Sequence, residues 1–386
     1  MFTVIRGGDV YAPEHLGRRD ILIANGVIAR MEERIEFPDG PDVTVIDASG
    51  TKVVPGLIDG HHHLLGGGGA FGPDSRSSIS YLSMLTKAGV TTCVGMLGID
   101  KIAYSLEDLL VRSRALEYEG LSAFMLTGSY TLPSPTITGA VMRDLYLIDK
   151  VVGVKIAVFE ALSSHPDKAM LRASIAETWL GGRLGGKAGI TVAHVGNVPG
   201  DLLDLVALLD EMNIPQSAFM LTHINRSRER LLNAAECGKR GMLLDLTGNI
   251  PQQSMIPASR AYKILLEEGV PAAVITLGSD SNPAYAYEGV QGILPVDICL
   301  KEMQAMVREW GMTLTQALLP LTVNPAKAYR LEETKGSLDV GKDADIVCLG
   351  ASLQVETVIA RGKLLLADGK PVVRGRLEEP TVQNLT

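Results

Sequence analysis

The hydrophobic pattern divides the chain into three stretches. Residues 1 to about 52 alternate short apolar runs with turn residues such as Asn25-Gly26, which is typical of antiparallel strands. From residue 53 the apolar runs become nearly continuous and alternate with amphipathic segments. This second pattern predicts buried parallel strands, each followed by a covering helix. From about residue 335 the short strands and turns return.

The middle stretch predicts eight strands with helices between them. Strands are expected at 53–63, 91–97, 122–129, 153–160, 189–196, 219–224, 241–247 and 272–279. Helices are expected at 102–119, 167–179, 200–212, 227–238, 298–310 and 313–329. Eight parallel strands close a barrel, for which about 250 residues is a usual size. We therefore predict an α/β fold with a (β/α)8 TIM-like barrel over 53–334, and a doubly wound open sheet is the competing architecture.

The β segments at the two chain ends are expected to form one small domain. Neither end has enough strands to be stable alone, because two or three strands bury too little apolar surface. We predict a discontinuous β-sandwich made of residues 1–52 and 335–386, with the barrel inserted between its halves.

Polar residues stand at the ends of several predicted barrel strands. His61 and His63 share one side of the first strand, since side chains alternate in an extended segment. His194, His223 and Asp280 end the fifth, sixth and eighth strands. Barrel enzymes carry their chemistry at these carboxyl ends, and neutral imidazole is a common metal ligand. The pattern predicts a metal site, and core histidines satisfied by hydrogen bonds are the alternative.

Lys155 lies among apolar neighbours in the fourth predicted strand. A cationic ammonium group would repel metal ions. A lysine that has reacted with carbon dioxide is instead an anionic carbamate, which has two oxygens to bridge two metals. The alternative is a buried amine paired with a carboxylate such as Asp280 or Glu160.

Composition narrows the class of protein. The 386 residues carry a formal net charge of −8, which argues against a nucleic-acid partner. The four cysteines are far apart and form no CxxC pair, which favours a reducing compartment. No signal-peptide core stands at the N-terminus, and no apolar run reaches the roughly 18–20 residues of a membrane span. A soluble cytoplasmic protein is expected.

Several motifs resemble the binuclear-zinc branch of the amidohydrolase superfamily, and within it the bacterial isoaspartyl dipeptidases. The similarity runs from about Val4 to Arg374. It is carried by six segments, namely Pro55-Gly56 through His63, the loop Gly66–Gly69, Met125-Leu126-Thr127-Gly128, Gly153-Val154-Lys155, Thr222-His223-Ile224-Asn225-Arg226 and Gly336 to Asp345.

The resemblance implies two zinc ions. His61, His63 and Asp280 would bind the more buried ion, and His194 and His223 the second. A hydroxide and carbamylated Lys155 would bridge the two. Metal binding lowers the pKa of water from 15.7 toward about 7, so hydroxide becomes available at neutral pH.

The resemblance also implies roles in catalysis and binding. Metal-bound hydroxide would attack an amide carbonyl, with Asp280 as general base and then general acid. Tyr130 would donate a hydrogen bond to the developing oxyanion, and Arg226 would hold a substrate carboxylate. Backbone N–H groups around Gly68 would approach the substrate. The alternatives are an ordinary loop tyrosine, a surface ion pair for Arg226 and a merely flexible glycine loop.

Four positions depart from the family pattern. Where the dipeptidases have a glutamate, a threonine, an arginine and a serine that contact substrate, this chain has Ala70, Ile99, Leu162 and Ala284. A free α-amino group would lose its charge partner beside Ala70 and Ile99, and a buried unpaired charge is costly. We predict poor use of free isoaspartyl dipeptides and a preference for N-acylated or cyclic amides. A replacement carboxylate in the pocket, such as Glu160, would count against this prediction.

The predicted function is that of a binuclear zinc-dependent amidohydrolase acting on a small amide or dipeptide-like substrate. One alternative is a genuine isoaspartyl dipeptidase with a rearranged pocket. A mononuclear deaminase or deacetylase conflicts with Lys155, since the bridging carbamate belongs to two-metal sites. A non-catalytic interaction protein conflicts with the complete ligand set. The resemblance further implies a homo-oligomer, and nothing in the chain indicates a nucleic-acid or membrane partner.

Overall fold

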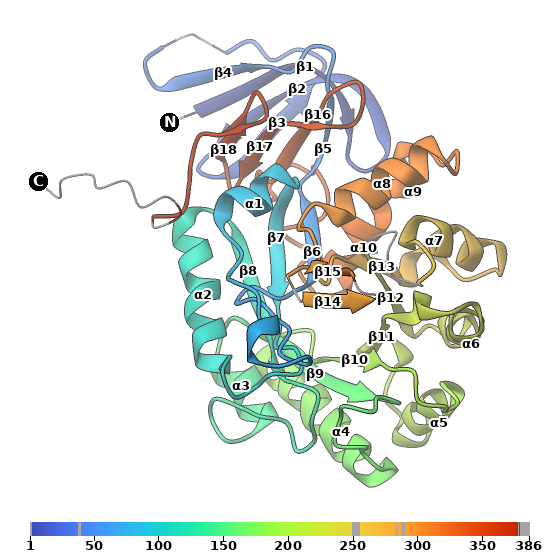
Figure 1. Ribbon diagram of the computed structural model, residues 1–386. Helices are drawn as coiled ribbons and strands as arrows, with labels where there is room; N and C mark the ends of the chain where they lie inside the picture. Colours follow the sequence, from blue (N-terminus) through green and yellow to red (C-terminus); the bar gives the residue numbers. More distant parts are fainter. Residues whose placement is uncertain are drawn as a thin grey trace, which may run out of the picture.

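The computed structural model describes residues 2–37, 40–248, 255–282, 284–287, 290–376 and 378, with only the backbone described at 284–287, 290 and 291. Figure 1 shows a barrel surrounded by helices, with a separate layer of strands at the top. That layer combines strands from the start and the end of the chain (Figure 1).

Eight parallel strands form the barrel, in a sheet order that follows the sequence. Asp280 N donates to His61 O at 2.9 Å and His63 N to Ser281 O at 3.3 Å, so the last strand meets the first. Almost every residue in these strands is buried, which explains their continuous apolar runs. The predicted barrel is confirmed, with strands β6 (Leu57–His62), β7 (Val90–Gly95), β8 (Ser122–Gly128), β9 (Val151–Val158), β10 (Ile190–Val195), β11 (Phe219–Thr222), β12 (Leu243–Thr247) and β13 (Ile275–Gly278).

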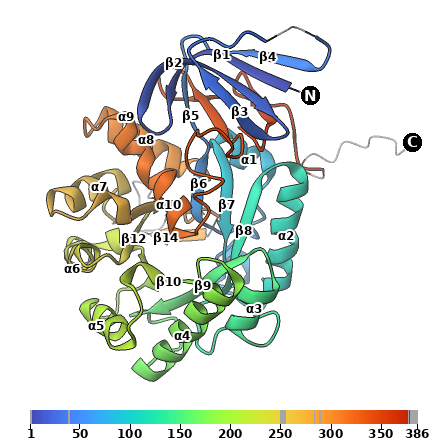
Figure 2. The same ribbon diagram turned by 180° about the vertical axis from the view of Figure 1, so that it is seen from behind.

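Helices cover the outside of the barrel, as Figure 2 shows from behind. The side chains of Ser105, Asp167 and Ser227 accept the N-terminal N–H groups of α2, α4 and α6, which fixes where these helices begin. The α-helices are α1 (Leu82–Lys87), α2 (Leu106–Glu119), α3 (Val141–Leu147), α4 (Lys168–Gly185), α5 (Leu203–Met212), α6 (Arg228–Lys239), α7 (Ala258–Glu267), α8 (Ile298–Arg308), α9 (Leu314–Leu318) and α10 (Val323–Ala328). Short 3₁₀ turns are η1 (Pro73–Ser75), η2 (Gln216–Ala218), η3 (Ile224–Arg226), η4 (Ala272–Val274) and η5 (Leu319–Leu321).

Some predicted elements differ from those observed. The strand expected at 53–63 is two strands, β5 (Lys52–Pro55) and β6, separated at Gly56. A Cβ on Gly56 would lie 2.1 Å from Thr91 Oγ1, so only glycine fits this crossing. The helix expected at 313–329 is divided by η5, which contains Pro320. Helices α1, α3 and α7 and the hairpin β14 (Ala284–Tyr287) and β15 (Val290–Ile293) were not predicted.

The strands of both chain ends form one nine-stranded sheet rather than two separately bonded sheets. Its halves join where β5 pairs antiparallel with β16, with Val54 opposite Val347. Ile5, Ile21 and Ile346 belong to its own hydrophobic core. The domain division at 52/53 and 334/335 stays a prediction. The other strands are β1 (Phe2–Tyr11), β2 (His15–Ala24), β3 (Val27–Glu32), β4 (Val43–Asp47), β16 (Ile346–Leu349), β17 (Val355–Ala360), β18 (Lys363–Ala367) and β19 (Lys370–Pro371).

All four cysteines are free and buried. Burial raises the pKa of the thiols of Cys93, Cys237 and Cys348 to about 12, so thiolate is scarce near neutral pH. We expect a thiol reagent such as Ellman's reagent to react very slowly at pH 8 with the native protein. Denatured protein should react at all four cysteines. Rapid labelling of native protein would contradict the buried positions.

Among the residues that the structure describes, no helix combines the length and apolar character needed to cross a bilayer.

Candidate active site

The residues predicted as metal ligands meet at the carboxyl end of the barrel. His61 lies in β6 and His63 directly follows that strand. Lys155 lies in β9 and His194 in β10. His223 and Asp280 follow β11 and β13, with left-handed φ angles of 64° and 49° that turn the chain just beyond each strand. All these side chains are buried except that of Asp280, which is 19% exposed.

His61, His63 and Asp280 form the tightest cluster. One possible ligand atom from each lies within 4.8 Å of the others. Asp280 Oδ1 is 3.0 Å from His63 Nε2 and 3.5 Å from His61 Nε2. These are the three residues expected at the more buried zinc ion.

His194 and His223 extend this cluster. Their ring centroids are 4.4 Å apart, and the ring of His223 is 5.0 Å from that of His61. Asp280 Oδ2 lies 3.8 Å from His223 Nδ1, so this carboxylate faces both histidine pairs.

Lys155 reaches the cluster from β9. Its Nζ donates to His61 Nε2 at 3.1 Å, and the side chain is almost fully buried. Among the described residues it makes no ion pair within 4.0 Å, so the alternative pairing with Asp280 or Glu160 is not observed. Burial lowers the pKa of Lys155 to about 8, because an unpaired ammonium is poorly solvated there.

A second set of buried residues orients the histidines, and the sequence prediction missed it. Thr222 Oγ1 donates to Asp245 Oδ2 at 2.8 Å, which leaves its oxygen free to accept from His61 Nδ1 at 3.1 Å. This arrangement directs Nε2 of His61 toward Lys155 and Asp280. Thr247 Oγ1 lies 2.6 Å from His223 Nδ1. The signal was a carboxylate, Asp245, in the middle of an otherwise apolar strand.

The electrostatics of the site favour the neutral form of three of its histidines. Burial, reinforced by nearby cations, lowers the pKa values of His61, His194 and His223. Burial alone would raise the pKa of Asp280, but the contact with His63 and the charges of His61 and Lys155 lower it below its usual range. Neutral imidazole and ionised carboxylate are the forms that bind metal ions.

His62 points away from the cluster, as its alternate position predicts. Its Nδ1 lies 2.7 Å from Asp59 Oδ2 and its Nε2 lies 2.6 Å from Ser80 Oγ. Ser279, in the loop that follows β13, donates to the same carboxylate at 2.6 Å. This buried network links the first and last barrel strands and leaves His62 no free nitrogen.

Tyr130 and Arg226 both contact His194. The hydroxyl of Tyr130 lies 2.6 Å from His194 Nδ1, and Arg226 Nη2 lies 3.2 Å from His194 Nε2. Burial raises the pKa of Tyr130 well above its usual value, so the hydroxyl keeps its proton. Arg226 Nε is buried without a hydrogen-bond partner among the described residues. A guanidinium with an unused donor at the site is suited to an anionic substrate group.

Glu160 lies at the same edge of the site. Its Oε2 is 2.9 Å from His194 Nε2, and its Oε1 accepts from the N–H of Leu162 at 3.1 Å. The hydrogen bond with His194 is the main influence that lowers the pKa of Glu160, and Arg226 adds to it. A carboxylate therefore does reach the site, but both its oxygens already have partners.

The glycine loop is ordered by its own hydrogen bonds. The N–H groups of Gly66, Gly67 and Gly69 donate to His63 O, Ser77 Oγ and Ser75 O. Of the four glycine N–H groups in this loop, only that of Gly68 has no hydrogen-bond partner among the described residues. A Cβ on Gly66 would lie 2.4 Å from Ser77 O at a φ of 94°, so this glycine serves the turn.

The apolar residues at the positions that depart from the family pattern are more exposed to solvent than a closed subsite requires. Ala70 is exposed, Leu162 is 57% exposed and Ile99 is half-buried. Ala284 begins β14, and its side chain is outside the described part of the structure. The predicted apolar subsite is thus an open edge rather than a closed pocket.

The donor set fits a metal ion. Four histidines and the carboxylate of Asp280 converge, and no described cation contacts all of them. Nδ1 of His63 is buried with no hydrogen-bond partner among the described residues. Imidazole and carboxylate suit zinc-like ions.

Comparison with known proteins agrees with this geometry. The amidohydrolase family model matches residues 199–365. The crystal structure of a beta-aspartyl dipeptidase from Fervidobacterium islandicum, in complex with beta-Asp-Leu dipeptide, is 33% identical. That match covers 96% of this chain and 98% of the other, with a TM-score of 0.90. A D-hydantoinase structure, 18% identical with a TM-score of 0.70, shares the fold.

Curated relatives are more distant. The adenine deaminase of Roseobacter denitrificans is 24% identical over 96% of this chain, which spans only 58% of that protein. The imidazolonepropionase of Symbiobacterium thermophilum is 26% identical over 95% of this chain and 92% of its own length. Taken with the barrel and its cluster of histidines, the 33% identity over nearly the whole length shows that the chain belongs to the amidohydrolase family, as a member that resembles the beta-aspartyl (isoaspartyl) dipeptidases.

Proposed function

We propose that this protein is a metal-dependent hydrolase of an amide C–N bond in a small molecule. The convergence of His61, His63 and Asp280, with ligand atoms within 4.8 Å, is the observation that carries the proposal. The names of its relatives, a dipeptidase and deaminases among them, support C–N bond hydrolysis as the reaction class. We propose two zinc ions as its cofactors, because imidazole and carboxylate ligands suit zinc.

His61, His63 and Asp280 would hold one ion, His194 and His223 the other, and a carbamate on Lys155 would bridge them. When bound, these ions supply a polarising charge for the carbonyl and nucleophilic hydroxide at neutral pH. Asp280, ionised and only partly exposed, would accept a proton at its carboxylate and return it to the leaving amine. Tyr130 keeps its hydroxyl proton and would donate to developing negative charge on the carbonyl oxygen.

Arg226 would orient the substrate through an anionic group. Its Nε has no partner among the described residues, and guanidinium favours bidentate contact with carboxylate. Ala70 and Ile99, at the positions that contact the substrate amine in the dipeptidases, carry no charge. We therefore propose a substrate with a neutral group there, such as an N-acylated or cyclic amide, rather than a free isoaspartyl dipeptide.

A second candidate is a genuine isoaspartyl dipeptidase with a rearranged pocket. Glu160 favours it, because this carboxylate lies 2.9 Å from His194 and could receive an ammonium group. Its existing contacts with His194 and Leu162 weigh against that role, since a substrate amine would have to compete for both oxygens.

Metal content tests the proposal directly. Protein loaded with zinc in the presence of bicarbonate should retain about two ions per chain, as the two-metal arrangement requires. Lys155→Gln should retain fewer, because glutamine forms no carbamate, and elemental analysis after gel filtration measures both. Lys101→Gln, an exposed lysine, is the control. One ion in the wild-type protein would favour a mononuclear deaminase or deacetylase, and none would contradict the metal site.

A further inference from the structure

A cavity at the amino end of the barrel is lined by positively charged side chains that have no acidic partner in its lining. It encloses about 330 Å³. Its floor includes Ala188, Ala218, Leu243 and Ala273, which precede or begin strands β10 to β13. The candidate active site lies at the opposite ends of these strands, so the cavity is separate from it.

Four cations line this cavity, namely Arg183, Lys187, Lys327 and Arg330. Among the described residues no aspartate or glutamate lines it, and none of the four forms an ion pair within 4.0 Å. Lys187 Nζ donates to Ile148 O at 2.5 Å and Arg330 Nη1 donates to Lys187 O at 3.2 Å. These carbonyl contacts hold the side chains in place without neutralising their charge. Burial lowers the pKa of Lys187, and the nearby charge of Asp149 opposes that shift.

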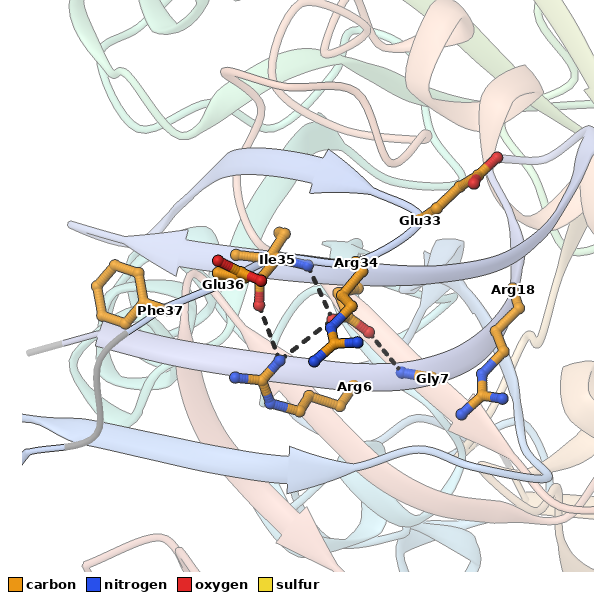
Figure 3. A pocket seen from close by; sticks show the side chains of 9 residues that line it. Arg6, Gly7, Arg18, Glu33, Arg34, Ile35, Glu36 and Phe37 are labelled. Carbon is orange, nitrogen blue, oxygen red and sulfur yellow. Dashed lines mark hydrogen bonds and ion pairs between the residues drawn. The ribbon is translucent and has the colours of Figure 1, made fainter.

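A larger cavity lies in the nine-stranded sheet, and in it cations and acids occur together. It encloses about 960 Å³, and Figure 3 shows its lining of arginines and acidic residues. There Arg6 contacts Asp20 at 3.2 Å and Ile35 O at 2.9 Å, and Glu33 contacts Arg19 at 3.4 Å. Because its charges are largely compensated within the protein, that cavity carries no comparable preference for an anion.

The unbalanced cations are notable in a chain with a net charge of −8. Four like charges around one concavity repel one another, and an anion between them would relieve that repulsion. Guanidinium and ammonium groups together are suited to phosphate oxygens.

The cavity also has an apolar part. The ring of Trp179 lies in the wall with the guanidinium of Arg183 5.6 Å from its centroid, and Leu243 is 7% exposed at the floor. A volume of 330 Å³ falls within the range of about 300–1,000 Å³ for small-molecule pockets. We propose that this cavity binds a small organic phosphate, with the phosphate at the cations and the organic part against Trp179.

Tryptophan fluorescence tests the proposal, since the chain has two tryptophans and only Trp179 lines the cavity. The Trp310→Phe variant leaves Trp179 as the single reporter. Titration with ribose 5-phosphate should change its emission saturably at one site per chain, and ribose should not. The affinity should fall as the salt concentration rises.

Three variants locate the binding. One is a double variant, Arg183→Gln with Lys327→Gln, made in the Trp310→Phe background. It should weaken ribose 5-phosphate binding at least about tenfold, because each substitution removes a charge-assisted hydrogen bond. In the wild-type background Lys263→Gln is the matched control, because Lys263 lies 5.6 Å from the ring of Trp310 outside the cavity. Calorimetry should show unchanged ribose 5-phosphate affinity for that variant. Asp280→Asn should also bind ribose 5-phosphate with unchanged affinity.

Thermal melts should show that the double variant folds like the wild type, because Arg183 and Lys327 are exposed and form no ion pair with any described residue. Equal affinity in the folded double variant would overturn the proposal. Loss of binding in Asp280→Asn would also overturn it by moving the ligand to the active site. Binding of an acidic peptide without any binding of ribose 5-phosphate would overturn it in favour of a protein partner.

Discussion

Replacing Asp280 with asparagine is expected to lower kcat by about 10²–10⁴-fold, the range typical of losing a general acid–base group. The two side chains have nearly the same shape, but an amide neither accepts a proton at neutral pH nor carries charge. In the native protein this carboxylate lies 3.0 Å from His63 and 3.5 Å from His61, so its charge also holds the metal ligands together.

The measurement is steady-state kinetics on the best available amide at saturating zinc, with the metal content of each sample determined. Asp210→Asn is a suitable control, because Asp210 lies near the end of α5 and pairs with Arg240 at the surface at 2.9 Å. If Asp280→Asn retained both full metal content and an unchanged kcat, Asp280 would have no role in proton transfer.

The second large effect concerns substrate choice. We expect free isoaspartyl dipeptides to have a kcat/KM about tenfold below that of their N-acetylated counterparts, because the ammonium group loses part of its solvation on binding and no acid at Ala70 or Ile99 compensates for it. Ala70 and Ile99 carry no charge, and both oxygens of Glu160 are engaged. The measurement is a hydrolysis panel in which each dipeptide is paired with its N-acetylated form, together with cyclic amides.

The variant Glu160→Gln, measured on the same panel, tests whether Glu160 binds the substrate amine. If Glu160 does not receive the amine, the ratio between free and acetylated substrates should stay the same in the variant, even if both become slower. If Glu160 does receive it, free dipeptides should be good substrates and the variant should lose activity on them selectively. Glu177→Gln, an exposed glutamate of α4, controls for the change in net charge. The second result would establish the isoaspartyl dipeptidase with a rearranged pocket.

If no substrate in the panel were hydrolysed, the metal content would distinguish a hydrolase of another amide from a non-catalytic protein. A protein that kept two ions per chain but cleaved nothing in the panel would require a different amide. A protein that bound no metal would instead match a non-catalytic member on the same scaffold. Metal analysis and the panel are therefore interpreted together.

The barrel and the convergence of the candidate ligand residues could be predicted from the sequence because both rest on local patterns. Near-continuous apolar runs follow from strands buried on both faces, and the carboxyl ends of parallel strands must meet at one end. His61, His63, His194, His223 and Asp280 therefore had to converge once eight strands were recognised. The family motifs added the roles of Lys155, Tyr130 and Arg226, which no periodicity reveals.

The surroundings of the ligands needed the tertiary structure. Asp245 and Thr222 are distant in sequence from His61, and only the closed barrel brings their oxygens to its Nδ1. The same holds for Glu160, whose contact with His194 depends on the pairing of β9 with β10. Hydrogen bonds between side chains on different strands leave no periodic trace in the sequence.

The sequence by itself determined the fold class, the candidate metal-binding residues and the family, because each depends on residue type and spacing along the chain. The tertiary structure decided which carboxylates face the site, which glycine N–H is free and where cations gather without acids. These properties depend on distances across the barrel between residues far apart in the chain. The cavity of Arg183 and Lys327 is of this kind, because its four cations come from the α4 region and the α10 region and meet only after folding.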